Sequence, residues 1–96
     1  NIGLVAGATH PEEAGRVRKI VGPDMFVLSP GVGAQGQNAA DIVPHVLRRG
    51  NIGVINSSRA IIFPKDALPG DGFFQGVRDQ ALKLDTEIRE AQARVA

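Results

Sequence analysis

Short apolar runs alternate with helix-like segments along this chain of 96 residues. The apolar runs cover residues 2–6, 26–29 and 52–55, and turn-forming residues follow each of them. Runs of this length with almost no polar alternation indicate strands that are covered on both faces, as in parallel sheets. They recur at intervals of roughly 25 residues with a helical pattern between them, which predicts βαβ units and therefore an α/β fold.

A first helix is expected between the first two apolar runs. Thr9 and Glu12 have the spacing of a capping box, Pro11 suits a first helical turn, and Gly22 marks the stop after Val21. The periodicity places four residues on its apolar face: Ala14, Val17, Ile20 and Val21. The three basic residues of this segment are expected to point outward: Arg16, Arg18 and Lys19.

Two further helices follow the second and third apolar runs. The second is expected to start after Asn38 as its N-cap and to end at residues 48–50, with Pro44 predicting a kink or a late start. Its predicted buried face consists of Ile42, Val43, Val46 and Leu47. The last helix follows the turn at residues 69–72, and its predicted buried stripe consists of Phe73, Val77, Ala81, Leu84 and Ile88.

Composition and charge restrict the classes of function. The net charge is +1 without a basic run, which argues against a nucleic-acid partner, and no apolar stretch is long enough to span a membrane. The absence of cysteine excludes disulfides and thiolate metal sites. We expect residues 1–96 to form one soluble, cytoplasmic domain. Because three parallel strands leave two unpaired edges, and because the chain opens in a strand-like run without an initiator Met, we expect this domain to be part of a larger one.

Two loops carry the candidate chemistry. Residues 30–36 place three glycines directly after the second strand, which leaves backbone N–H groups uncovered, and Gln35 is the long polar side chain among them. Arg59 follows two serines after the third strand, and its guanidinium can bind phosphate through two parallel hydrogen bonds. Together, the two loops predict a site for an anionic ligand.

Three strand ends resemble those of a known enzyme family. Residues 7–9, 30–36 and 56–61 are similar, in order and spacing, to the last three strand ends of orotidine 5'-phosphate decarboxylase. The resemblance implies that the chain is the C-terminal βαβαβα portion, strands six to eight, of a (β/α)8 TIM barrel. It also implies the conversion of orotidine 5'-monophosphate to UMP and CO2 in de novo pyrimidine biosynthesis, without a metal or organic cofactor, in a homodimer with shared active sites.

The resemblance assigns roles to five residues. Gln35 is similar to the glutamine that bridges phosphate and pyrimidine, Pro30 and Val32 resemble residues that pack against the ring, and Ser58 and Arg59 correspond to the phosphate contacts. Ser58 stands where the family often has glycine. The family's catalytic pattern, Asp-x-Lys-x-x-Asp, is absent, so we expect no catalytic residue in this chain and no decarboxylase activity from the 96 residues alone.

Other interpretations remain open at this point. The glycines of residues 30–36 could only permit a tight turn, and Arg59 could be a surface ion-pair residue. His10 and His45 favour helix-end and surface roles over acid–base chemistry, and Phe73 and Phe74 favour packing over stacking on a ligand. The alternative function is a non-catalytic phosphate-binding half-barrel or another sugar-phosphate TIM-barrel enzyme, such as a decarboxylase, epimerase or synthase.

Overall fold

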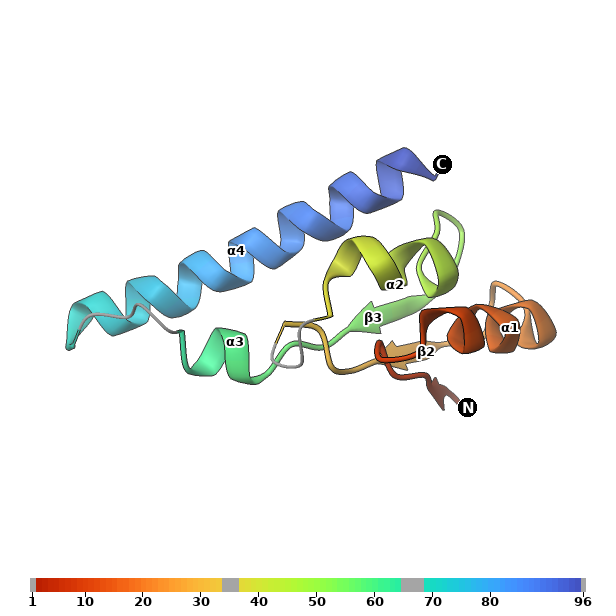
Figure 1. Ribbon diagram of the computed structural model, residues 1–96, viewed down its shortest axis with the longest axis horizontal. Helices are drawn as coiled ribbons and strands as arrows, with labels where there is room; N and C mark the ends of the chain where they lie inside the picture. The colour runs from red at the N-terminus through yellow and green to blue at the C-terminus, as the bar shows by residue number, and fades with distance from the viewer. Residues whose placement is uncertain (1, 34–36, 65–68, 96) are drawn as a thin grey trace.

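The computed structural model of the protein describes residues 2–33, 37–64 and 69–95. Strands and helices alternate along them in the order β1 (Leu4–Val5), α1 (Pro11–Val21), β2 (Val27–Ser29), α2 (Ala39–Val46), β3 (Gly53–Ile55), α3 (Arg59–Ile62) and α4 (Asp71–Arg94) (Figure 1). The sheet has the order β1-β2-β3, and both strand pairs are parallel. The predicted α/β architecture is therefore confirmed, and each strand lies inside its predicted apolar run. The short helix α3 occupies a segment for which the sequence predicted only an apolar run.

The two faces of the sheet differ in burial. Val5, Leu28 and Val54 are in register across the three strands, and neighbouring residues such as Val27 point to the opposite face. Val27 is 2% exposed, whereas Val5 is 70% and Val54 is 46% exposed. The expectation that both faces are covered is wrong for the described chain, because its helices cover one face only. The apolar row on the other face, and the unpaired outer edges of β1 and β3, are open in this part of the chain.

Helix α2 forms the centre of the helical layer. Asn38 is its N-cap, and the Asn38 Oδ1 atom accepts a hydrogen bond from the backbone N–H of Asp41 at 3.1 Å, as predicted. Ile42 and Val43 are fully buried, which confirms the predicted apolar face. The helix ends earlier than expected, with Leu47 as its C-cap. The buried residues form two clusters, and α2 contributes to both. One cluster consists of Ala6, Ala8, Ala14, Val27, Val32, Ile42 and Val46, and the other of Ala39, Val43 and Ala91.

Helix α4 runs along α2 and continues past it toward α3 (Figure 1). Its predicted stripe is partly wrong, because Ala81 is exposed and Gln80 is half-buried in its place. Both residues satisfy helical spacing, but at this point α4 borders a cavity rather than a continuous apolar core, so the polar Gln80 is accommodated there. Phe73 and Phe74 contact each other edge to face, with ring centroids 6.0 Å apart. Phe73 is half-buried, but Phe74 is 70% exposed, so the predicted core packing is not seen for Phe74 in the described chain.

Helix α1 differs from its predicted pattern at both its start and its exposed face. It begins at Pro11, which lies in the first turn as predicted, but its N-cap is His10 rather than Thr9. Ile20 is 84% exposed and Val17 is 37% exposed, although both were expected on the buried face. The reason is that α1 packs on α2 through a narrow face of small residues, among them Ala14, rather than through a wide apolar stripe.

Arg18 corrects the sequence prediction most strongly, because its side chain points inward and is 6% exposed. Its Nε and Nη2 donate to the Val46 carbonyl at 3.1 and 3.0 Å, and Nη2 also donates to the Ile52 carbonyl at 2.9 Å. Its Nη1 donates to the carbonyls of Gly22 and Met25 at 3.0 and 2.6 Å. Burial lowers the pKa of Arg18. One side chain thus satisfies carbonyls from both helix ends and from the segments leading into β2 and β3.

Gly15→Ala should destabilise the protein, although alanine favours helices. A Cβ atom at Gly15 would lie 2.8 Å from Nδ1 and 3.3 Å from Cβ of His45 on α2, so the two helices would have to separate. We expect the free energy of unfolding, measured by urea denaturation, to fall by about 1 kcal/mol or more. In a His45→Ala background the same change should instead stabilise by up to about 1 kcal/mol. A gain of stability in both backgrounds would show that this contact does not limit the packing.

Candidate functional site

The three strand ends singled out in the sequence meet at one edge of the sheet. The backbone N–H of Ala8, after β1, donates to the Pro30 carbonyl at 2.9 Å. The backbone N–H of Asn56, after β3, donates to the Ser29 carbonyl at 3.0 Å. The parallel topology therefore places the loops that follow β2 and β3 beside each other, as the sequence predicted.

These two loops touch at Gly33. Its backbone N–H donates to the Gln37 carbonyl at 2.7 Å, and its φ angle is +94°, a conformation that favours glycine. A Cβ atom at this position would lie 3.0 Å from the Ala60 Cβ and 3.1 Å from the Ser57 Oγ. Two segments more than twenty residues apart thus rest directly on each other, without room for a side chain at position 33.

The predicted phosphate contacts lie at the surface of this edge. Ser58 precedes α3 and is exposed, and its Oγ accepts a hydrogen bond from the Asn56 Nδ2 at 3.0 Å. Arg59 is the first residue of α3 and is also exposed. Within the described ranges its guanidinium forms no ion pair. The Arg59 side chain is therefore accessible to a ligand at the carboxyl edge of the sheet.

The predicted ring contacts lie deeper. Pro30 is half-buried, and Val32 is 3% exposed and belongs to the core beneath the loop. Gln35 lies outside the described residues. The structure thus brings the segments of Pro30, Val32, Ser58 and Arg59 to one edge of the sheet, while the roles of these residues and of Gln35 stay predictions.

A cavity of about 260 Å³ separates the two loops from α4. Its lining comprises Val32, Gly33, Gln37, Asn38, Ser57, Ala60, Ile61, Gln80, Lys83, Leu84 and Glu87. Of the predicted site residues described in the structure, only Val32 borders it. No pattern in the sequence indicated that α4 would contribute Gln80, Lys83 and Glu87 next to these loops, because this contact depends on how α4 packs across the molecule.

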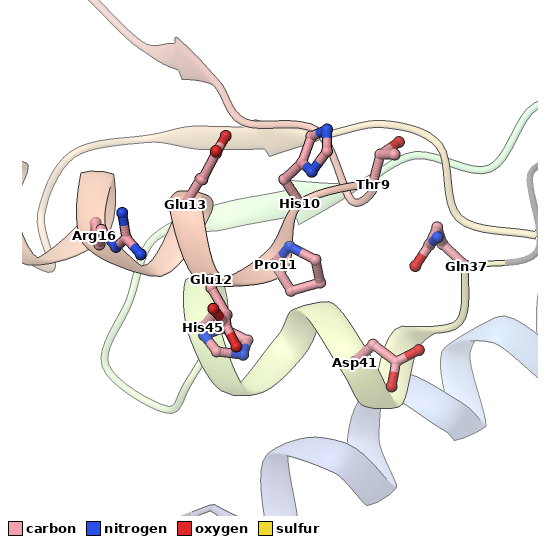
Figure 2. Close-up of a pocket in the computed structure, with 9 residues that line it drawn as sticks. All are labelled: Thr9, His10, Pro11, Glu12, Glu13, Arg16, Gln37, Asp41 and His45. Carbon is pink, nitrogen blue, oxygen red and sulfur yellow. The ribbon is translucent and has the colours of Figure 1, made fainter.

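A larger groove of about 470 Å³ lies between α1 and α2, and Figure 2 shows its side chains. Its lining comprises Thr9, His10, Pro11, Glu12, Glu13, Arg16, Gln37, Asp41 and His45. Among the described residues, no cluster of three or more His, Asp or Glu side chains could hold a metal ion. His10 precedes α1 and is exposed, and His45 lies in α2 against Gly15. These placements agree with the helix-end and helix-surface roles predicted for the two histidines.

The described lysines lie away from the strand ends in the chain. Lys19 is an exposed residue of α1, and Lys83 is an exposed residue of α4. Both therefore occupy helix faces, as the sequence predicted, whereas Lys65 lies outside the described residues.

In the described ranges, no helix is both long and apolar enough to span a membrane. At the strand ends, the exposed guanidinium of Arg59 has no ion pair with any residue that the structure describes, which suits an anionic group.

Three proteins similar to this chain all have the same name, orotidine 5'-phosphate decarboxylase. The chain is 44% identical over 96 residues to orotidine 5'-phosphate decarboxylase of Haloarcula marismortui, an alignment that covers 94% of this chain and 34% of the relative. The identity to the enzymes of that name from Natronomonas pharaonis and Polaromonas naphthalenivorans is 46%, with 94% and 96% of this chain and 33% and 31% of the relatives covered. No protein-family model matches the chain.

The alignments cover nearly all of this chain but only part of each relative. The chain spans about a third of the length of the curated relatives that it matches. The resemblance predicted from the three strand ends is confirmed by an identity that extends over nearly the whole chain. This chain is thus similar, over at least 94% of its length, to a stretch of orotidine 5'-phosphate decarboxylase that makes up about one third of that enzyme.

Proposed function

We propose that this protein acts as an orotidine 5'-phosphate decarboxylase, which converts orotidine 5'-monophosphate to UMP and CO2 in de novo pyrimidine biosynthesis. The observation that carries the proposal is the identity of 44% and 46% to enzymes of that name over at least 94% of the chain. In this assignment the 96 residues supply the loops that grip the phosphate and the pyrimidine. The lysine and aspartates that protonate and stabilise the reacting carbon belong to another part of the enzyme.

The proposed binding site uses both loops. Arg59 would donate a pair of charged hydrogen bonds to the phosphate, and the backbone N–H of Ser58 would add another. Gln35 would join phosphate and pyrimidine, while Pro30 and Val32 would contact the ring. The phosphate is remote from the bond that breaks, so its binding energy would be used to hold the pyrimidine against the catalytic groups.

We further propose that the chain forms strands six to eight of a TIM barrel within a cytoplasmic homodimer. The apolar row of Val5, Leu28 and Val54 supports this placement, because its outer members Val5 and Val54 are exposed, whereas the inner face of a barrel is lined by such side chains and excluded from water. The open edges of β1 and β3 would pair with the neighbouring strands of the barrel. A catalytic site would then exist only in the complete protein, and the isolated chain would show no turnover.

Competition binding on the complete protein tests the proposal. UMP should displace a bound 6-substituted UMP analogue at a much lower concentration than ribose 5-phosphate does, because the site would recognise the pyrimidine as well as the phosphate. Equal displacement by the two ligands would favour the alternative, a sugar-phosphate enzyme or a simple phosphate-binding module. Decarboxylation of orotidine 5'-monophosphate by the same preparation, followed by the loss of its absorbance, would establish the reaction itself.

A further inference from the structure

We propose that Gly33 is a positioning residue, which sets the place of Arg59 by allowing the loop after β2 to rest directly on the segment that opens α3. The inference depends on the proposed function, because it concerns how that site holds a phosphate. It adds Gly33 to the residues on which the site depends. Gly33 is not proposed to touch the substrate, and it is not among the five predicted site residues.

The contact is close and specific to a residue without a side chain. A Cβ atom at Gly33 would lie 3.0 Å from the Ala60 Cβ and 3.1 Å from the Ser57 Oγ. The Ser57 Oγ atom could turn away by rotation about χ1, but the Ala60 Cβ atom is bonded directly to the backbone and can move only with it. Any larger residue at position 33 would therefore push the segment from Ser57 to Ala60 away from the loop.

Arg59 lies inside the segment that would move. It precedes Ala60 in the chain, and both residues are in the single turn of α3, so their backbones shift together. A bidentate contact between guanidinium and phosphate depends on the distance and the plane of the fork. A displacement of less than 1 Å at α3 would therefore weaken the phosphate contact, although neither Gly33 nor Ala60 is proposed to bind the ligand.

Backbone conformation alone does not account for the constraint at Gly33. Gly50 has nearly the same φ angle, +91° against +94°, but a Cβ atom there would meet nothing within 4 Å. Substituting Gly50 therefore imposes a similar backbone strain without a steric contact. The two glycines form a matched pair, and only Gly33 lies between the two proposed substrate loops.

Ligand affinities of the complete protein test the inference. We expect Gly33→Ala to weaken the binding of UMP by about tenfold or more and to weaken the binding of uridine, which lacks the phosphate, much less. Some loss for uridine is expected because the strained loop also carries the proposed ring contacts. Gly50→Ala should change neither affinity. In the Gly33→Ala/Ala60→Gly double variant the colliding methyl group is absent, and much of the affinity for UMP should return.

A second variant approaches the contact from the other loop. Ala60→Val adds bulk against Gly33 without backbone strain, so it should show the same selective loss even if Gly33→Ala fails to fold. Wild-type affinity for UMP in both variants, or equal losses for UMP and uridine, would overturn the positioning role. A wild-type protein that does not prefer UMP to ribose 5-phosphate would instead refute the proposed function, so the two failures are distinguishable.

Discussion

Arg59→Ala in the complete enzyme should lower kcat/KM for orotidine 5'-monophosphate by about 3 kcal/mol or more, which is a loss of about 150-fold. The reason is that Arg59 is exposed at the carboxyl edge of the sheet and forms no ion pair within the described residues. Its fork is therefore available for the phosphate, and its removal leaves a doubly charged group without its main partner. Steady-state kinetics and the affinity for UMP measure the effect.

Two variants control for charge and geometry. Arg78→Ala removes the same charge from an exposed position on α4 and should leave kcat/KM nearly unchanged. Arg59→Lys keeps the charge but loses the planar fork, so it should fall between the wild type and Arg59→Ala. The affinity for uridine should be similar in all of them. An Arg59→Ala enzyme with wild-type efficiency would refute the assignment of Arg59 to the phosphate.

The order of elements was predictable because it depends on local patterns. Apolar runs bounded by turn residues located all three strands, and the Asn38 cap located the start of α2. Since parallel strands end at one edge of a sheet, the sequence also predicted that residues 30–36 and 56–61 would share a site. The similarity to one enzyme family, confirmed over nearly the whole chain, is the basis for the ligand that we propose and that the pattern alone left open.

The contacts between distant segments were not predictable from the pattern. The contact of Gly33 with Ser57 and Ala60 depends on how two loops fold back from the sheet, and periodicity carries no information about it. The exposure of Ile20 and the burial of Arg18 invert the usual ranking of apolar and charged residues. Arg18 is buried because several carbonyl groups converge on it, and this convergence exists only after α1, α2, β2 and β3 have assembled.

Arg18→Met should therefore be the most destabilising of the substitutions considered. Methionine has a similar length but donates no hydrogen bond, so all five hydrogen bonds from Arg18 to four carbonyl groups would be lost. The Ile52 carbonyl would keep the Val27 N–H at 3.2 Å, and the Val46 carbonyl would keep only the long contact with the Asn51 Nδ2 at 3.5 Å. The Val46 carbonyl is in the buried part of this network, where water cannot easily replace the guanidinium. We expect the free energy of unfolding to fall by about 3 to 5 kcal/mol, measured by urea denaturation of the complete protein.

Substitutions in the same helix separate the network from the loss of a charge. Arg16→Met removes an exposed guanidinium from α1 and should change stability by about 0.5 kcal/mol at most. Arg18→Lys keeps the positive charge, but a single ammonium group cannot reach carbonyls on four sides, so most of the loss should remain. If the Arg18→Met and Arg16→Met variants were equally stable, the four carbonyl groups would be satisfied without the guanidinium. Arg18 would then not be the residue that holds α1 and α2 to β2 and β3.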